Sequence, residues 1–258
     1  MSWTPSQYHK FEAERRRPAD DLVAALPALA PRSVVDLGCG GGALARRLAA
    51  HWPQAVVTGV DSSAAMLELA RATPSPVTWV EADLNHWQPD VPMDVPMDVI
   101  VSNAALHWLG DHRRLLPRLA ALLAPGGVLA VQMPRNFGAP SHALLRATAA
   151  EPQWAERLAG VYDLIPVHGP AEYYDWLAPV AKSVDIWETE YLHALHGDNP
   201  ALEWTKGTAL VPVRERLEAS AYQAFLASYG ARLAQAYPAR PDGVTLFPFR
   251  RLFIIARV

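Results

Sequence analysis

The residues of this sequence best suited to binding chemistry begin with a glycine-rich turn in VVDLGCGGGALARRLA, residues 34–49. Gly38 and Gly40 lack a Cβ atom, so a ligand can lie against the backbone, and N–H groups of the following helix can face it. Gly38-x-Gly40-x-x-Ala43 also fits the dinucleotide-binding fingerprint. One such turn is weak evidence, because glycines also make tight strand-to-helix connections.

Three aspartates, each expected at the end of a successive strand, accompany this turn. Asp36 can face a cationic amino group, Asp61 is placed to reach two ribose hydroxyls, and Asp83 can accept from an adenine amino group. A pyrophosphate would be repelled by so many carboxylates. The set therefore favours a positively charged, phosphate-free cofactor over a dinucleotide.

The elements that must position these residues alternate along the first half of the chain. Short β-branched runs predict strands at 33–38, 55–61, 77–84, within 97–108 and at 128–134. Helix-forming runs predict helices at 19–29 (after Pro18), 42–52, 62–72 (capped by Ser62 or Ser63) and 112–127. This alternation implies right-handed crossovers and an α/β fold with a parallel, doubly wound sheet.

The second half of the chain has a different pattern. Residues 184–195 and 246–258 read as strands, helical segments precede and separate them, and a turn is expected at 167–177. We expect a helical cap near the carboxyl edge of the sheet, where open α/β sheets bind ligands. The predicted organisation is a single domain over 1–258, with an N-terminal segment at 1–18, a cofactor-binding core at 30–135, and a cap at 136–181 and 198–240.

Composition narrows the class of protein. The 258 residues are 51% hydrophobic, enough for a core, and the net charge of −3 provides no net basic surface for nucleic acid. A single cysteine, Cys39, excludes an internal disulfide framework and a cysteine-rich metal cluster. Because no apolar run resembles a signal peptide or reaches membrane-spanning length, we expect a cytoplasmic protein with no membrane partner. Histidines and acids show no metal-ligand spacing, so no metal is expected.

Five successive stretches together resemble the motifs of class I S-adenosylmethionine-dependent methyltransferases, over roughly residues 30–135. They are VVDLGCGGG, VTGVDSSAAML, VEADL, SNAALHWL and APGGVLAVQMP. The N-terminal stretch, VDIWETEYLHAL and FPFRRLFIIAR are similar to the trans-aconitate 2-methyltransferase family within this superfamily, so the resemblance covers nearly the whole chain. Two departures are Gly41, often proline in relatives, and the duplicated VPMD at 91–98.

The resemblance implies a Rossmann-like, mostly parallel seven-stranded sheet with a helical cap between its last strands. It also implies S-adenosylmethionine as methyl donor and a small-molecule tricarboxylate, trans-aconitate, as acceptor, giving a monomethyl ester and S-adenosylhomocysteine. Its implied cofactor-binding residues are Phe11, Arg15, Asp36, Gly38, Gly40, Asp61, Ser62, Met66, Asp83, Leu84, Asn103 and Ala104. Candidate contacts with the acceptor are Tyr8, Arg15, His107, Tyr174, Trp204, Lys206, Arg250 and Arg251.

Methyl transfer to a carboxylate would need no catalytic base, because such an acid is already ionised near neutral pH. His107 is therefore expected to contact the substrate or to fill a loop, and Cys39 to be a small packing residue. The reaction would be an in-line displacement between an anion and a cation, which the protein must position and desolvate. Arginine suits the remaining carboxylates, because its planar fork binds them bidentately.

Other interpretations stay open from the sequence. The same cofactor could serve another small acid, a phenol or a quinone precursor as acceptor. A regulatory protein could bind the cofactor without transferring the methyl group, and a dinucleotide oxidoreductase is the least favoured reading. Which carboxylate is methylated, which of Arg250 and Arg251 faces the substrate, and whether the protein is a monomer are not fixed.

Overall fold

The computed structural model describes residues 12–88, 97–162 and 167–258. Two compact units share the chain. The sheet unit comprises Arg17–Pro134, Pro166–Thr189 and Arg251–Val258, and the helical unit comprises Met1–Arg16, Arg135–Ile165 and Glu190–Arg250.

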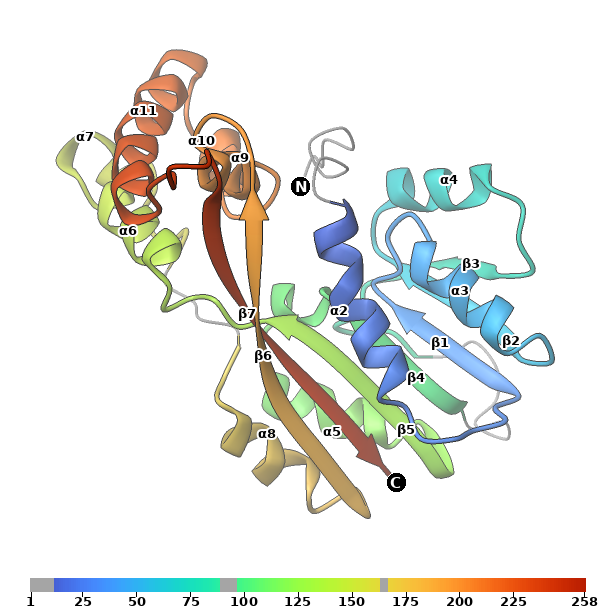
Figure 1. Ribbon diagram of the computed structural model, residues 1–258. Helices are drawn as coiled ribbons and strands as arrows, with labels where there is room; N and C mark the ends of the chain where they lie inside the picture. Colours follow the sequence, from blue (N-terminus) through green and yellow to red (C-terminus); the bar gives the residue numbers. More distant parts are fainter. Residues whose placement is uncertain (1–11, 89–96, 163–166) are drawn as a thin grey trace. The chain divides into compact units, whose positions relative to one another are not determined.

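A seven-stranded sheet with strand order β3-β2-β1-β4-β5-β7-β6 organises the described residues (Figure 1). Its strands are β1 (Ser33–Leu37), β2 (Val56–Asp61), β3 (Thr78–Glu81), β4 (Met97–Asn103), β5 (Leu123–Pro134), β6 (Ser183–Leu195) and β7 (Thr245–Arg257). Strands β1 to β5 pair in parallel, and β7 pairs antiparallel with β5. The predicted α/β class, with a doubly wound, mostly parallel seven-stranded sheet, is confirmed.

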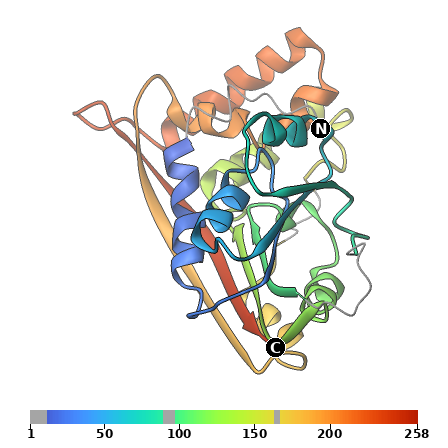
Figure 2. The same ribbon diagram turned by 90° about the vertical axis from the view of Figure 1, so that its right-hand side faces the viewer.

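Helices cover both faces of this sheet. Helix α3 (Ala43–His51) packs on β1 and β2, α4 (Ala64–Ala72) packs on β2 and β3, and α5 (His112–Ala120) packs on β5. The crossovers from β1 to β2 and from β4 to β5 run in opposite directions across the sheet. Right-handed connections then place α3 and α5 on opposite faces, as Figure 2 shows. The order reverses between β1 and β4, the position at which open α/β sheets bind ligands.

The first described helix corrects a prediction. A helix was expected to start after Pro18, but α2 spans Glu12–Ala24 and contains Pro18. Proline removes one backbone hydrogen bond from a helix interior. The residues before the proline, Glu12–Arg17, are all strong helix formers, which favours the continuous helix despite that loss.

Two further boundaries differ from the prediction. The turn expected at 167–177 contains helix α8 (Pro170–Leu177), in which the Glu172 side chain accepts a hydrogen bond from the Gly169 N–H at 2.8 Å. Helix α5 ends at Ala120, not at residue 127, because the following residues join β5, where Leu123 pairs with Met97. Helix α8 packs against α5 and belongs to the sheet unit, although its residues fall within the predicted cap.

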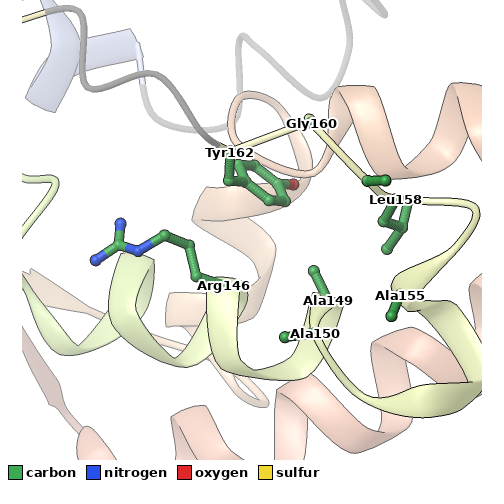
Figure 3. Close-up of a pocket in the computed structure, with 8 residues that line it drawn as sticks. Arg146, Ala149, Ala150, Ala155, Leu158, Gly160 and Tyr162 are labelled. Carbon is green, nitrogen blue, oxygen red and sulfur yellow. The ribbon is translucent and has the colours of Figure 1, made fainter.

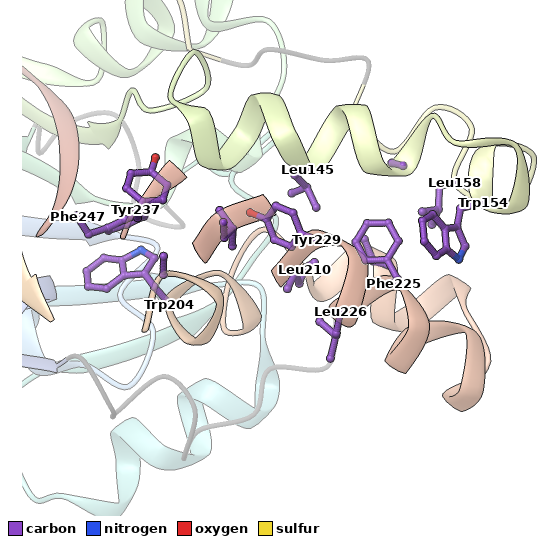
Figure 4. Close-up of a cluster of buried hydrophobic side chains, with 14 of the residues drawn as sticks. Leu145, Trp154, Leu158, Trp204, Leu210, Phe225, Leu226, Tyr229, Tyr237 and Phe247 are labelled. Carbon is purple, nitrogen blue, oxygen red and sulfur yellow. The ribbon is translucent and has the colours of Figure 1, made fainter. Parts of the chain in front are cut away.

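The helical unit has a hydrophobic core of its own. Its helices are α6 (Pro140–Ala149), α7 (Pro152–Ala155), α9 (Pro200–Lys206), α10 (Val211–Arg216) and α11 (Ala219–Ala236). Figure 4 shows Leu145 of α6 beside Phe225 and Tyr229 of α11 in this core. The Tyr229 hydroxyl also donates to the Ser141 carbonyl at 2.9 Å, which ties α11 to α6. No helix among the described ranges is both long enough and apolar enough to cross a membrane.

Candidate functional site

The glycine-rich turn between β1 and α3 is held against the end of β2. The N–H groups of Gly38 and Cys39 both donate to the Val60 carbonyl, at 2.8 and 3.0 Å. Gly38 has a φ of 76°, and a Cβ atom on it would lie 2.1 Å from the Cβ of Ala105, in the segment after β4. Cys39 is buried, which agrees with the packing role expected from the sequence, and burial raises the pKa of its thiol. The turn thus joins the carboxyl ends of three strands.

We expect Gly38→Ala to lower the free energy of unfolding by about 2–4 kcal/mol, because the methyl group would clash with Ala105 at a strained φ. Gly41→Ala is the matched control, since a Cβ there has nothing within 4 Å. Denaturant unfolding of the two variants measures the difference. Equal stabilities would show that the close contact at Gly38 does not exist.

Asp61, the last residue of β2, connects this turn to the start of α4. Its Oδ2 accepts from the Gly40 N–H at 2.8 Å, and its Oδ1 accepts from the Ser63 N–H at 2.9 Å. Each carboxylate oxygen has a second lone pair, so both can still accept from ligand hydroxyls. Met66 extends the same surface, since its Cε lies 3.3 Å from the Cβ position of Gly40. Of the two predicted capping serines, Ser63 rather than Ser62 caps α4.

Asp36 lies beneath this turn and is a buried acid whose carboxyl group is only partly hydrogen-bonded. Only 1% of its surface is exposed, and its Oδ2 has no hydrogen-bond partner among the described residues. Burial, reinforced by repulsion from Asp61, raises the pKa of this carboxyl from 3.8 to about 7, while the Ala45 N–H opposes the shift. Two neighbouring carboxyls of this kind favour a cationic group beside them.

Asp83 follows β3, at the next strand end along the sheet. Its side chain is exposed, and its Oδ1 accepts from both the backbone N–H and the side-chain amide of Asn85 at 2.9 Å, which lowers its pKa. A hollow of about 270 Å³ is lined by residues between Val80 and Gln88, Asp83 among them. Leu84 is buried, 3.7 Å from the Cβ position of Gly38.

The ends of β4 and β5 present neutral polar groups. Asn103 pairs in register with Gln132, and the Ala104 N–H donates to the Gln132 carbonyl at 2.9 Å. Ala104 adopts a φ of 53°, which turns the chain sharply after β4. Gln132 was not among the predicted site residues, although it is the one polar side chain in the predicted strand VLAVQMP.

The predicted acceptor contacts are scattered over the chain. Tyr8 and Phe11 lie outside the described residues, and so does the side chain of Arg15, whose backbone is in α2. His107 lies in the short helix η1 (Leu106–Trp108), with its partly buried ring 4.7 Å from that of Trp108. Tyr174, on α8, is half exposed.

Four other candidates differ sharply in their surroundings. Arg251 is buried, whereas Arg250 is exposed and lies 3.6 Å from a Glu190 carboxylate oxygen. Trp204 is packed in the core of the helical unit. Lys206 donates to Glu203 of the same helix at 2.5 Å. The structure thus brings Asp36, Gly38, Gly40, Asp61 and Met66 together. Trp204 and Lys206 belong to the helical unit, and Tyr174 lies on α8 of the sheet unit.

A second hollow, of about 360 Å³, lies in the helical unit (Figure 3). Arg146 and Tyr162 are the polar side chains that line it, and the other lining residues are alanines, Leu158 and Gly160. Arg146 donates to the Phe137 carbonyl at 3.0 Å, and the Tyr162 hydroxyl donates to the Ala209 carbonyl at 2.8 Å. Both side chains are therefore engaged within the unit, and the hollow lacks the acids of the strand ends. Within the described ranges, no three His, Cys, Asp or Glu side chains gather as metal ligands.

Comparisons with known proteins fit this geometry. Residues 34–127 match a family model described as a methyltransferase domain. The chain is 47% identical to proteins named trans-aconitate 2-methyltransferase from Azoarcus sp. (strain BH72) and Methylobacterium nodulans, covering 99% of this chain and 98% of each relative.

Solved structures share the fold at low sequence identity. The YcgJ protein from Bacillus subtilis aligns with a TM-score of 0.60 at 14% identity, over 94% of this chain and 98% of that one. A Haemonchus contortus phosphoethanolamine N-methyltransferase, solved with phosphomonomethylethanolamine and S-adenosylhomocysteine, aligns with a TM-score of 0.52 at 15% identity, over 93% of this chain and 52% of that one.

Proposed function

The chain belongs to the trans-aconitate 2-methyltransferase family of S-adenosylmethionine-dependent methyltransferases, and from this premise we propose that it methylates one carboxylate of trans-aconitate. The products would be the monomethyl ester and S-adenosylhomocysteine. The acceptor follows from the relatives, and the structural observation that supports the cofactor is the buried Asp36, whose Oδ2 lacks a partner among the described residues, beside Asp61 at the glycine-rich turn.

The residues at this turn fit the cofactor. Asp36 offers a carboxylate to its ammonium group, Asp61 retains lone pairs for the two ribose hydroxyls, and Met66 provides an apolar surface for the adenine. Gly38 and Gly40 would line the methionine and ribose portion, and Asp83 and Leu84 would address the adenine amino edge. S-adenosylmethionine supplies a methyl group activated by a positively charged sulfur.

The acceptor side needs positioning groups and no catalytic base. A carboxylate acceptor is ionised at neutral pH, so the protein has to hold its oxygen in line with the methyl carbon and keep water away. His107 would contact the acceptor or fill the loop after β4. Asn103 and Ala104, at the end of β4, would lie beside the reacting centre.

Burial favours Arg251 over Arg250 as the residue that binds a second carboxylate of the acceptor. A buried guanidinium interacts more strongly with an anion than an exposed one, which solvent screens. We expect Arg251→Gln to lower kcat/KM for trans-aconitate by about 10- to 100-fold, mainly through KM. Arg250→Gln is the control and should change it less than about threefold. If Arg250→Gln has the larger effect, the assignment is reversed.

The partner, the cellular compartment, the cap and the remaining substrate contacts stay predictions. We propose a small tricarboxylate as partner rather than nucleic acid, action in the cytoplasm, and a cap contributed by the helical segments of 136–181 and 198–240. Tyr8, Phe11 and Arg15 remain candidate contacts carried over from the family resemblance. Tyr174, Trp204 and Lys206 remain candidates because of the chemistry of their side chains.

Incubation with methyl-labelled S-adenosylmethionine and a panel of organic acids and phenols tests the proposal. Label in a base-labile ester of trans-aconitate is the expected result. Transfer to a phenol and to none of the carboxylates would overturn the acceptor. Binding of the cofactor with no transfer to any acceptor would favour a regulatory protein.

A further inference from the structure

The side chain of Gln132 is buried with its hydrogen-bonding capacity unused. None of its surface is exposed, and neither its amide oxygen nor its amide nitrogen has a hydrogen-bond partner among the described residues. Leaving such groups unpaired is unfavourable, because each loses its hydrogen bonds to water and gains none in the protein. An apolar residue would avoid this cost, and the flanking Val131 and Met133 are apolar and fully buried.

Register places Gln132 in a row of polar side chains on one face of the sheet. Residues directly opposite on neighbouring strands point to the same face, so Asn103 and Gln132 share a face. Asp36 lies opposite Val101, two residues before Asn103, and therefore points to that face as well. The row runs from Asp36 on β1 through Asn103 on β4 to Gln132 on β5. The Oδ1 of Asn103 is also buried without a partner among the described residues.

The position of Gln132 in this row indicates what it binds. The acids that fit the cofactor lie at the ends of β1, β2 and β3, and β5 lies beyond β4 on the other side of the strand reversal. On β7, Arg251 lies opposite Pro134, two residues after Gln132, and so shares this face. The β5 end is therefore on the acceptor side, between the cofactor residues and a buried arginine.

We propose that the amide N–H of Gln132 binds the acceptor carboxylate that receives the methyl group, with Asn103 beside it. This inference rests on the proposed function and adds a residue that the family resemblance did not supply. An amide donates a hydrogen bond without bringing a full positive charge to the attacking oxygen. The oxygen is thus oriented while keeping more of its electron density than it would against a guanidinium.

Gln132→Met keeps the length and approximate shape of the side chain and removes its hydrogen bonds. The variant should lose about 10- to 100-fold in kcat/KM for trans-aconitate, while the Kd of S-adenosylhomocysteine stays within about twofold of wild type. Its melting temperature without ligands should equal or exceed that of wild type, because an unpaired buried amide is gone. Trans-aconitate added to the S-adenosylhomocysteine complex should raise the melting temperature of wild type and not that of the variant.

Met133→Leu is the matched control, because this side chain is equally buried on the same strand and points to the opposite face. Gln132→Leu repeats the test if the methionine variant does not fold. Unchanged trans-aconitate kinetics in either folded variant would overturn the inference. A tenfold or greater loss of S-adenosylhomocysteine affinity would assign Gln132 to the cofactor and overturn it as well. Failure of wild type to methylate trans-aconitate would instead contradict the proposed function, and the comparison would then use the carboxylate that wild type does methylate.

Discussion

Asp61→Asn should reduce the affinity for S-adenosylhomocysteine by about 100-fold or more, the largest loss expected from any single substitution at the strand ends. Both oxygens of Asp61 accept backbone N–H groups, from Gly40 and Ser63. An asparagine would turn its NH₂ group toward one of these donors and leave that donor unpaired. The substitution therefore loosens the turn and weakens the ribose contacts at the same time.

Asp98→Asn is the matched control for this substitution. Asp98, near the start of β4 and therefore at the opposite end of this strand from the site, accepts two backbone N–H groups on one oxygen, Oδ2, from Arg32 at 2.6 Å and from Ser33 at 3.1 Å. The amide oxygen of an asparagine can keep both hydrogen bonds, so this variant removes a carboxylate charge and should leave the Kd of S-adenosylhomocysteine within about twofold of wild type. Calorimetric titration of both folded variants measures the difference. The assignment of Asp61 is refuted by an Asp61→Asn protein that binds as tightly as the control.

Asp36→Asn should stabilise the ligand-free protein at pH 8 and weaken cofactor binding. The pKa of Asp36 is raised from 3.8 to about 7 in the folded protein. The folded state therefore holds this proton more tightly than the unfolded state does. Stability from this group is fully present below pH 3.8 and is lost as the pH rises through 7, a loss on the order of 4 kcal/mol.

Asparagine cannot ionise, so the variant lacks that loss and should be about 2–4 kcal/mol more stable than wild type at pH 8. At pH 4 the two proteins should differ far less. Burial lowers the pKa of His142 to about 4, so this residue makes the free energy of unfolding rise with pH. It contributes equally to both proteins and does not affect their difference. Denaturant unfolding across pH 4–8 measures the difference. If the difference in free energy of unfolding between variant and wild type does not change over this range, the pKa of Asp36 is not raised.

Much of the fold could be predicted from local pattern. Buried β-branched runs such as those of β1 and β4 indicate strands whatever their partners, and the alternation with helices dictates the parallel order. The predicted helix start at Pro18 was wrong, because the strong helix formers before the proline, Glu12–Arg17, outweigh its local preference. Helix α8 was missed for a similar reason, since its glycine and proline suit a turn as well as a helix start.

The candidate site was predictable in its acids and less so in its neutral groups. Asp36 and Asp61 stand at fixed places relative to the glycine-rich turn, but the raised pKa of Asp36 depends on burial. Gln132 belongs to no sequence motif. Its proposed role in binding the acceptor follows from its register with Asn103 and from its amide, which has no hydrogen-bond partner among the described residues. The burial of Arg251 had a sequence signal, because Phe249 and Arg251 fall on the same face of a two-residue repeat and Phe249 is apolar.

The central claim is that these carboxyls select a nucleoside that carries an ammonium group and no diphosphate. Parallel calorimetric titrations of wild type with S-adenosylhomocysteine and NAD at pH 6 test it most directly. At this pH Asp36 is mostly protonated, and the ammonium of the ligand should expel its proton. Titrations in two buffers of different ionisation enthalpy should therefore reveal release of about one proton per S-adenosylhomocysteine bound, little release at pH 8, and no binding of NAD. Binding of NAD with no binding of S-adenosylhomocysteine, or S-adenosylhomocysteine binding at pH 6 with no proton released, would contradict the claim.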